Sequence, residues 1–241
     1  MENTAAENHG GLHQIFIESA DHRSSLTQLT PQHLQLVLRA YRDRLAEMSQ
    51  HDDIAYCALF KNSGPIAGAS LEHVHTQLIG MPVVPMDAAN ELQRMHDRFQ
   101  QDGTCILCDV LRDELASGKR IVAETSSFVA YCPYASRFSH EVWITPRQHA
   151  SRFEATSDDL LCELADVFRD ALQKIELVLS NSSYNILFQL APFDTACEDY
   201  YHWRIEICPR LSTAAGFELG SGCFINPTTP ENAAQTLRTI V

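Results

Sequence analysis

The feature that most constrains the fold of this chain is an internal repeat. Residues 13–22, HQIFIESADH, are echoed by residues 140–149, HEVWITPRQH, and in both segments the second histidine follows the first by nine positions. Each copy is followed by a helix-period segment and then by two short apolar runs. A repeat of this kind predicts two units of the same architecture.

Both predicted helices have one apolar face. In residues 33–47 apolar side chains recur every three or four positions, and residues 160–178 show the same spacing behind Ser157, the expected N-cap. The apolar runs that follow the two helices are 55–60, 74–79, 184–190 and 203–208. We therefore predict an α+β fold of tandem halves, each a mainly antiparallel sheet with a packed helix.

The repeat also predicts how the chain is divided. We expect a first, catalytic half over residues 11–85 and a second, non-catalytic half over residues 121–241. The connecting segment, residues 86–120, contains an amphipathic stretch and a C-x-x-C motif.

Charge and cysteine content limit the partners and the compartment. With 18 Lys and Arg against 31 Asp and Glu, the net charge is −13, which disfavours nucleic acid as a partner. The polar start of the chain lacks a signal-peptide pattern, and no apolar run approaches the roughly 20 residues of a membrane span. We therefore expect a cytoplasmic protein whose eight cysteines are reduced, with no membrane partner.

A row of polar residues follows a small-residue turn in the first half. The turn, Gly64 to Ser70, precedes His73, His75 and Gln77, which alternate with other residues and so face one way on a strand. A neutral imidazole can attack phosphorus and form a covalent phosphoramidate. The Gln77 amide and the main-chain N–H groups of the turn could donate to a phosphate. Structural histidines and metal ligation are the alternatives.

A second chemical centre is predicted around the C-x-x-C motif. Cys105 and Cys108, together with His149 and His202, could complete a tetrahedral Cys2His2 zinc site that stabilises the fold. A redox pair or two buried thiols remain open from the residues alone. We interpret the remaining cysteines as small buried hydrophobes, namely Cys57, Cys132, Cys162, Cys197, Cys208 and Cys223.

The second half has different residues at the positions of the polar row. Arg204 stands where His75 does in the first half, and Glu206 stands where Gln77 does. A guanidinium cannot act as a nucleophile, so this half is expected to bind and stabilise rather than to react.

The motifs resemble those of the galactose-1-phosphate uridylyltransferase family of the histidine-triad superfamily. Residues 60–77 and the following Met81-Pro-Val-Val-Pro85 are similar to its active-site segment, and residues 202–227 are similar to its ADP-glucose phosphorylase-like members. The resemblance implies transfer of a nucleoside monophosphate between UDP-glucose and galactose 1-phosphate through a nucleotidyl-histidine intermediate. An ADP-glucose phosphorylase or adenylyltransferase, and an inactive zinc-stabilised nucleotide-binding remnant, are the alternatives.

The resemblance also implies roles for individual residues. His75 would be the nucleophile, and Gln77 would contact the transferred phosphate. The expected substrate-binding residues are Asn62, Gly68, Ala69, Ser70, Gln77, Phe217 and Gly220. The expected zinc ligands are Cys105, Cys108, His149 and His202, with His22 and His73 forming part of another site. The family often has proline between the two histidines of the row, where this chain has Val74.

The first metal site is expected to be incomplete. No cysteine precedes His22, whereas the family carries a cysteine pair in a region before this point. The chain resembles the family with that region removed, and we expect a truncated sequence; a separate polypeptide that supplies the region, or an inactive remnant, are alternatives. The expected partners are a nucleotide sugar and a sugar phosphate, and pairing through exposed sheet edges leaves a homodimer open.

Overall fold

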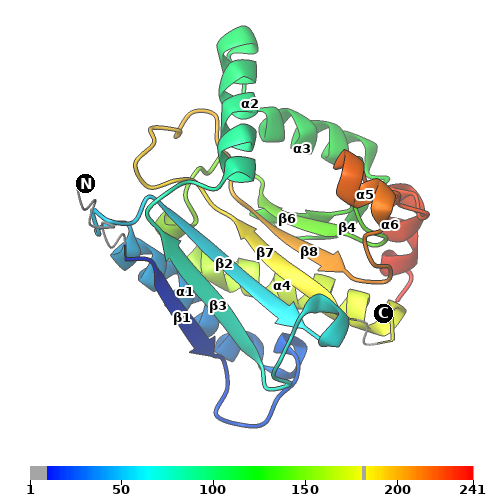
Figure 1. The fold of residues 1–241 in the computed structure, drawn as a ribbon. Coiled ribbons are helices and arrows are strands. Elements are labelled where there is room, and N and C mark those ends of the chain that lie inside the picture. Colours follow the sequence, from blue (N-terminus) through cyan, green and yellow to red (C-terminus); the bar gives the residue numbers. More distant parts are fainter. Residues whose placement is uncertain (1–9, 181–182, 241) are drawn as a thin grey trace.

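The computed structural model describes residues 10–180 and 183–240, and these contain one eight-stranded sheet (Figure 1). The strands are β1 (Leu12–Ile17), β2 (Tyr56–Ser63), β3 (His75–Met81), β4 (Ile121–Glu124), β5 (Phe128–Tyr131), β6 (Val142–Pro146), β7 (Tyr184–Gln189) and β8 (Arg204–Pro209). The helices are α1 (Pro31–Met48), α2 (Met86–Asp102), α3 (Ile106–Ser117), α4 (Asp158–Val178), α5 (Gly216–Ser221) and α6 (Pro230–Arg238).

The strand order contains the repeat that the sequence predicts. The order is β1-β3-β2-β7-β8-β6-β5-β4, with antiparallel neighbours throughout, so β1-β3-β2 is matched in reverse by β6-β8-β7. The two copies meet where β2 pairs with β7. The α+β fold class is therefore confirmed, with both copies contributing to a single sheet.

The two predicted helices, α1 and α4, pack against each other on one face of this sheet (Figure 1). The Thr30 side chain caps α1 by accepting from the N–H of His33, and Ser157 caps α4 by accepting from that of Leu160, as expected. The apolar stripe of each helix is buried, and Arg42 on α1 forms an ion pair with Asp158 at the start of α4. Burial of both stripes on one side leaves the other side of β3 available for polar side chains.

The histidine echo is one residue out of register in the strands. Ile15 lies opposite Gln77, whereas its counterpart Trp143 lies opposite Glu206. The echo instead aligns Trp143 with the next residue, Phe16. The connection from the strand to the second histidine is therefore one residue shorter in the second half. Of the two pairs of repeated histidines, only His22 and His149 occupy equivalent positions.

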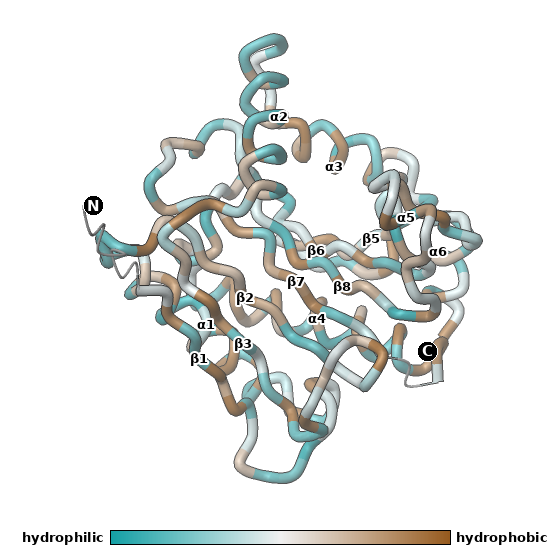
Figure 2. The backbone as a smooth tube through the Cα atoms, viewed as in Figure 1, coloured by the Kyte–Doolittle hydropathy of each residue, from teal (hydrophilic) through white to brown (hydrophobic). Residues whose placement is uncertain are grey.

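Several elements were not predicted. The connecting segment forms α2 and α3, and β4 and β5 extend the second half of the sheet. Leu111 on α3 packs with Val129 and Tyr131 of β5, whereas Phe128 and Ala130 belong to the main core. Because side chains of a strand alternate between faces, α3 covers the sheet face opposite the main core. Figure 2 shows apolar and polar residues interleaved along the strands.

Candidate active site and metal centre

Strand β3 carries two of the three predicted polar residues. His75 is the first residue of β3, and Thr76 and Leu78 are buried, with the Thr76 hydroxyl donating to Glu18. His75 and Gln77 therefore point to the opposite face of the sheet. His73 precedes the strand, so it lies beside the row that the sequence predicts rather than extending it.

One hydrogen bond sets the chemical state of His75. Its Nδ1 lies 2.8 Å from the carbonyl oxygen of His73, which can only accept, so Nδ1 carries the proton and donates it. In the neutral ring the lone pair is then on Nε2. The side chain is 6% exposed, so its protein contacts hold the ring in place. This is the state that a histidine nucleophile requires.

Gln77 has a partner that sequence reasoning missed. The Nε2 of His13, on the edge strand β1, lies 3.0 Å from the Oε1 of Gln77. Because Oε1 can only accept, His13 is the donor, and both amide hydrogens of Gln77 remain able to donate elsewhere. His13 lies 64 positions earlier in the chain, and only the pairing of β1 with β3 brings it close.

The small-residue turn has a different role from the one expected. Gly64 has a φ of 80°, and a Cβ there would lie 2.3 Å from the Ser183 hydroxyl, so only glycine fits. The N–H groups of Ala67 and Ala69 donate to Gly64, and that of Gly68 donates to Pro65. The prediction that the turn amides are available to a phosphate is therefore wrong for Ala67, Gly68 and Ala69, because closing the turn uses their N–H groups.

The structure brings several predicted substrate contacts to one pocket. A pocket of about 440 Å³ is lined by Asn62, Ala69, Ser70 and His73 and also by Lys61. The Oδ1 of Asn62 accepts a 2.8 Å hydrogen bond from Asn185, which also donates to the Ala67 carbonyl. This pair fixes the turn against β2 and β7.

Phe217 and Gly220 are not brought to this pocket. Both lie on α5, and Phe217 is 56% exposed. The segment after α5 is attached to the second half, where Phe224 contacts Phe138 and Asn226 accepts from the Ser139 hydroxyl. Within this chain, α5 therefore does not line the pocket.

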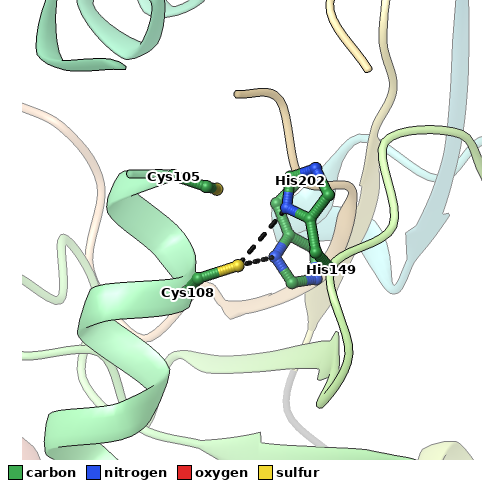
Figure 3. A group of neighbouring side chains, drawn as sticks. All are labelled: Cys105, Cys108, His149 and His202. Atoms are coloured by element: carbon green, nitrogen blue, oxygen red, sulfur yellow. Dashed lines mark hydrogen bonds between the residues drawn. The ribbon is translucent and has the colours of Figure 1, made fainter. Parts of the chain in front are cut away.

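Four predicted metal ligands converge in the second half (Figure 3). Cys105 caps α3 and Cys108 lies in its first turn, while His149 follows β6 and His202 precedes β8. Their ligand atoms all lie within 4.8 Å of one another. The Sγ of Cys108 is 3.3 Å from Nδ1 of His149 and 3.6 Å from Nδ1 of His202.

This geometry fits a tetrahedral cation. Metal–sulfur bonds of 2.3 Å and metal–nitrogen bonds of 2.0–2.1 Å at the tetrahedral angle place sulfur and nitrogen about 3.6 Å apart. The Nε2–H of His149 donates to the Glu198 carbonyl at 2.6 Å, which leaves Nδ1 as the ligand atom. Burial raises the pKa of Cys108 to about 12 and lowers that of His202 to about 3. Both groups are thus buried uncharged until a cation compensates a thiolate.

His22 and His73 form the counterpart of the His149–His202 pair. Their ring centroids are 5.7 Å apart at 69°, compared with 5.4 Å and 68° in the second half. The Nε2–H of His73 donates to the Ser19 carbonyl at 2.8 Å. Among residues 10–180 and 183–240, no group of three or more candidate ligands includes either histidine.

The remaining cysteines divide into two groups. Cys57, Cys132, Cys197 and Cys208 are buried, as expected. Cys162 and Cys223 are exposed, so the prediction that they are buried hydrophobes is wrong. Cys162 occupies the solvent-facing side of α4, and Cys223 follows α5.

The counterpart of the polar row is engaged in ion pairs. Arg204 is buried, contacts Glu91 of α2 at 2.6 Å and Glu206 at 2.7 Å, and lies over the ring of Trp143. Glu206 also pairs with Arg137. Burial tends to raise the pKa of Glu206, but Arg204 and Arg137 hold it below its usual value. This half therefore uses the equivalent positions to attach α2 to the sheet.

Comparisons with known proteins show the family of this chain. Residues 12–240 match a family model described as a domain of unknown function, DUF4921. The chain is 36% identical over 232 residues to ADP-glucose phosphorylase of Arabidopsis thaliana and 30% identical over 236 residues to galactose-1-phosphate uridylyltransferase of Thermotoga maritima. Each match covers 95% of this chain, and the second covers 74% of the relative. This chain belongs to the galactose-1-phosphate uridylyltransferase family.

The similarity extends to solved structures of the uridylyltransferase family. The crystal structure of the Arabidopsis ADP-glucose phosphorylase with bound ADP-glucose has a TM-score of 0.89 and 35% identity, and the match covers 96% of this chain and 74% of that one. The chain spans 65% of the full length of that phosphorylase. No helix in the described residues has the length and apolarity needed to cross a membrane.

The buried ion pairs of Arg204 predict that removing one carboxylate charge strongly destabilises the fold. We expect Glu206→Gln to lower the free energy of unfolding at pH 7 by about 3 kcal/mol, because it removes the buried carboxylate that Arg204 and Arg137 share and leaves Arg204 with Glu91 alone. Urea denaturation measures this. Glu47→Gln, which alters a pair whose carboxylate is 63% exposed, should cost less than about 1 kcal/mol.

The same pair predicts a pH dependence. Because the pKa of Glu206 is lowered on folding, its stabilisation is present above the unfolded-state value of about 4.3 and is lost as pH falls through the folded-state value. The difference between wild type and Glu206→Gln should therefore decrease below pH of about 4. Equal losses for the Glu206 and Glu47 variants at pH 7 would contradict this interpretation.

Proposed function

We propose that this chain carries the nucleotidyl-transfer chemistry of its family, with His75 as the nucleophile. The observation that supports this most strongly is the hydrogen bond from His75 Nδ1 to the His73 carbonyl, which leaves the lone pair on Nε2. A pocket lined by Asn62 and Ser70, and by His73 and Val74 immediately before His75 in the chain, supports nucleotide-sugar binding in this part of the sheet. Membership of the family supports the same chemistry.

The reaction consists of two displacements at phosphorus. Nε2 attacks the α-phosphorus of the nucleotide sugar, a P–N bond forms, and the P–O bond to the sugar phosphate breaks, so that the sugar 1-phosphate leaves. An acceptor phosphate oxygen then attacks the same phosphorus, and the P–N bond breaks to regenerate His75. The Gln77 amide, with its oxygen held by His13, donates to a phosphate oxygen in both steps.

We favour ADP-glucose as the nucleotide sugar and inorganic phosphate as the acceptor. The Arabidopsis ADP-glucose phosphorylase is 36% identical to this chain, compared with 30% for the Thermotoga uridylyltransferase. Val74, in place of the proline that is frequent between the two histidines, also favours this assignment over the galactose enzyme. UDP-glucose with galactose 1-phosphate is the second candidate pair, supported by the uridylyltransferase relative.

The proposed substrate contacts follow the pocket. Asn62, Ala69 and Ser70 line it, and Gly68 closes the adjoining turn. The geometry supports these four positions and gives no support within one chain to Phe217 and Gly220, which lie on α5.

The nucleophile assignment predicts a labelled protein. Incubation with ADP-glucose carrying ³²P at the α-phosphate should label the chain at close to one AMP per active site. His75→Ala should abolish the label, because it removes the attacking nitrogen. The label should be stable in alkali and lost in acid, as expected of a phosphoramidate.

A matched control distinguishes the loss of the nucleophile from a general effect of removing a histidine side chain. His33→Ala alters an exposed histidine on α1 and should label normally. Equal labelling of the His75 and wild-type chains would contradict the assignment. A wild-type chain that binds ADP-glucose without becoming labelled would instead support the inactive nucleotide-binding remnant. Repeating the experiment with labelled UDP-glucose decides between the two donors.

We also propose that the Cys105–Cys108–His149–His202 group binds structural zinc. Two thiolates and two imidazoles form a donor set that zinc prefers, and the spacing of the ligand atoms fits tetrahedral bonds. Bound zinc would tie α3 to the loop after β6 and to the start of β8. Because all four ligands come from the protein, its role is stability rather than catalysis.

Zinc binding predicts a stoichiometry and a stability effect. The purified chain should contain about one zinc, and Cys108→Ser should remove it and lower Tm by about 10 °C, since a site saturated a thousandfold contributes about 4 kcal/mol. Cys162→Ser, at an exposed position on α4, should keep both zinc and Tm. Zinc retained in full by Cys108→Ser, measured by atomic emission, would contradict the site.

We also propose a reducing compartment and a homodimer. All eight cysteines are free, which supports a reducing compartment such as the cytoplasm. Strand β1 is an edge of the sheet, and its Ile15 and Ile17 are more than half exposed. This supports a homodimer formed through that edge, which sedimentation would test.

A further inference from the structure

Strands β2 and β3 separate next to the proposed nucleophile. Their pairing ends at Phe60 opposite Gln77, although β2 continues to Ser63 and remains paired with β7 as far as Ser63 opposite Tyr184. The 440 Å³ pocket is lined by residues of β2 beyond this point, including Asn62, and by residues just before β3, including His73. The pocket therefore lies where the two strands separate, against the residues that immediately precede His75 in the chain.

A buried ion pair lies in this separation. Lys61 and Glu18 are 2% and 4% exposed, and the Lys61 ammonium contacts a Glu18 carboxylate oxygen at 2.7 Å. The same carboxylate accepts from the hydroxyls of Tyr41 and Thr76. Every partner of Glu18 thus comes from a different element, namely β2, α1 and β3.

The ammonium also contacts the main chain of the nucleophile. Lys61 Nζ donates to the carbonyl oxygen of His75 at 2.7 Å. The preceding carbonyl, that of Val74, accepts from the N–H of Glu18 on the β1 side. Because successive carbonyls of a strand point in opposite directions, the His75 carbonyl points toward β2, where the ladder has ended. Lys61 therefore supplies the donor that a paired β2 would have supplied.

The second half shows what happens without this pair. There the ladder between β7 and β8 continues past Leu187 opposite Glu206, the counterpart of Phe60 opposite Gln77, to Gln189 opposite Arg204. The residue equivalent to Lys61 is Phe188, which packs against the ring of Phe153. The half with the Lys61–Glu18 pair has separated strands, and the half with Phe188 at the position of Lys61 has a closed ladder.

Stability alone does not account for a buried ion pair. Removing two charges from water costs several kcal/mol, and well-packed apolar residues of similar size are often as stable. In this fold an apolar residue, Phe188, occupies the position in the second half that is equivalent to Lys61. The buried Lys61–Glu18 pair therefore calls for a reason tied to the separated strands.

We propose that Lys61, held by Glu18, is a positioning residue that replaces the missing ladder donor at His75 and keeps β2 and β3 apart around the pocket. This deepens the proposed function, because it assumes that His75 is the nucleophile. Lys61 does not touch the reacting atoms; it fixes the main chain from which the imidazole projects.

The test uses the full chain with Glu18→Gln and Lys61→Met combined, since the single Lys61 change would leave a buried carboxylate uncompensated. We expect single-turnover labelling at saturating α-³²P ADP-glucose to slow about 100-fold, the effect expected of a misplaced nucleophile; saturation separates this rate from any change in Kd caused by the pocket-lining position of Lys61. Hydrogen exchange of the Val74–Gln77 main chain should become faster. Phe188→Met, the matched change in the second half, should alter neither measurement.

Each outcome decides the proposal. Labelling and exchange at wild-type rates in the double variant would overturn it, and so would a general loss of Tm and binding, which would indicate a structural role alone. A wild-type chain that never becomes labelled would refute the proposed function. Exchange would then decide the positioning role separately, because faster exchange confined to Val74–Gln77 supports it and unchanged exchange overturns it.

Discussion

The pairing of β2 with β7 is the interaction on which the rest of the structure depends. Five residue pairs, from Leu59 opposite Phe188 to Ser63 opposite Tyr184, join two three-strand repeats into one sheet. Because the repeats are joined in this way, α1 and α4 lie against each other on one face and bury both apolar stripes. The opposite face is left for the polar residues of β3 and β8.

Equivalent positions on that face have different interactions in the two halves. His75 has one ring nitrogen fixed by the His73 carbonyl and the other left with its lone pair. Its counterpart Arg204 is held by Glu91 and Glu206 under α2. The candidate metal ligands show the reverse division, since the four-ligand group lies in the second half and the first has the His22–His73 pair. We therefore propose that the first half carries the chemistry and that the second contributes stability.

The sequence predicts the features that depend on local pattern. Helices α1 and α4 have clear apolar periodicity and side-chain caps, so their bounds were predicted to within a few residues. The row containing His75 and the four metal ligands were found from motif spacing and from the family resemblance. Strand β5 was missed because it is buried on both faces and shows no alternation.

Features that depend on distant pairing could not be predicted. His13 reaches Gln77 only through the register of β1 with β3, and Lys61 reaches the His75 carbonyl only because β2 and β3 separate. The amides of the small-residue turn were misjudged because their acceptors, Gly64 and Pro65, become clear only when the turn is formed. In each case the sequence does not show which strands pair in which register, or which main-chain groups are already hydrogen-bonded.

The proposed chemistry depends on a fold that presents His75 with its lone pair on Nε2. Nitrogen-15 NMR of histidine-labelled protein reports the tautomer of each ring directly. The structure predicts that in the neutral His75 ring Nδ1 carries the proton and donates it to the His73 carbonyl, whereas Nε2 is unprotonated. A His75 ring protonated on Nε2 and bare on Nδ1 would contradict the account.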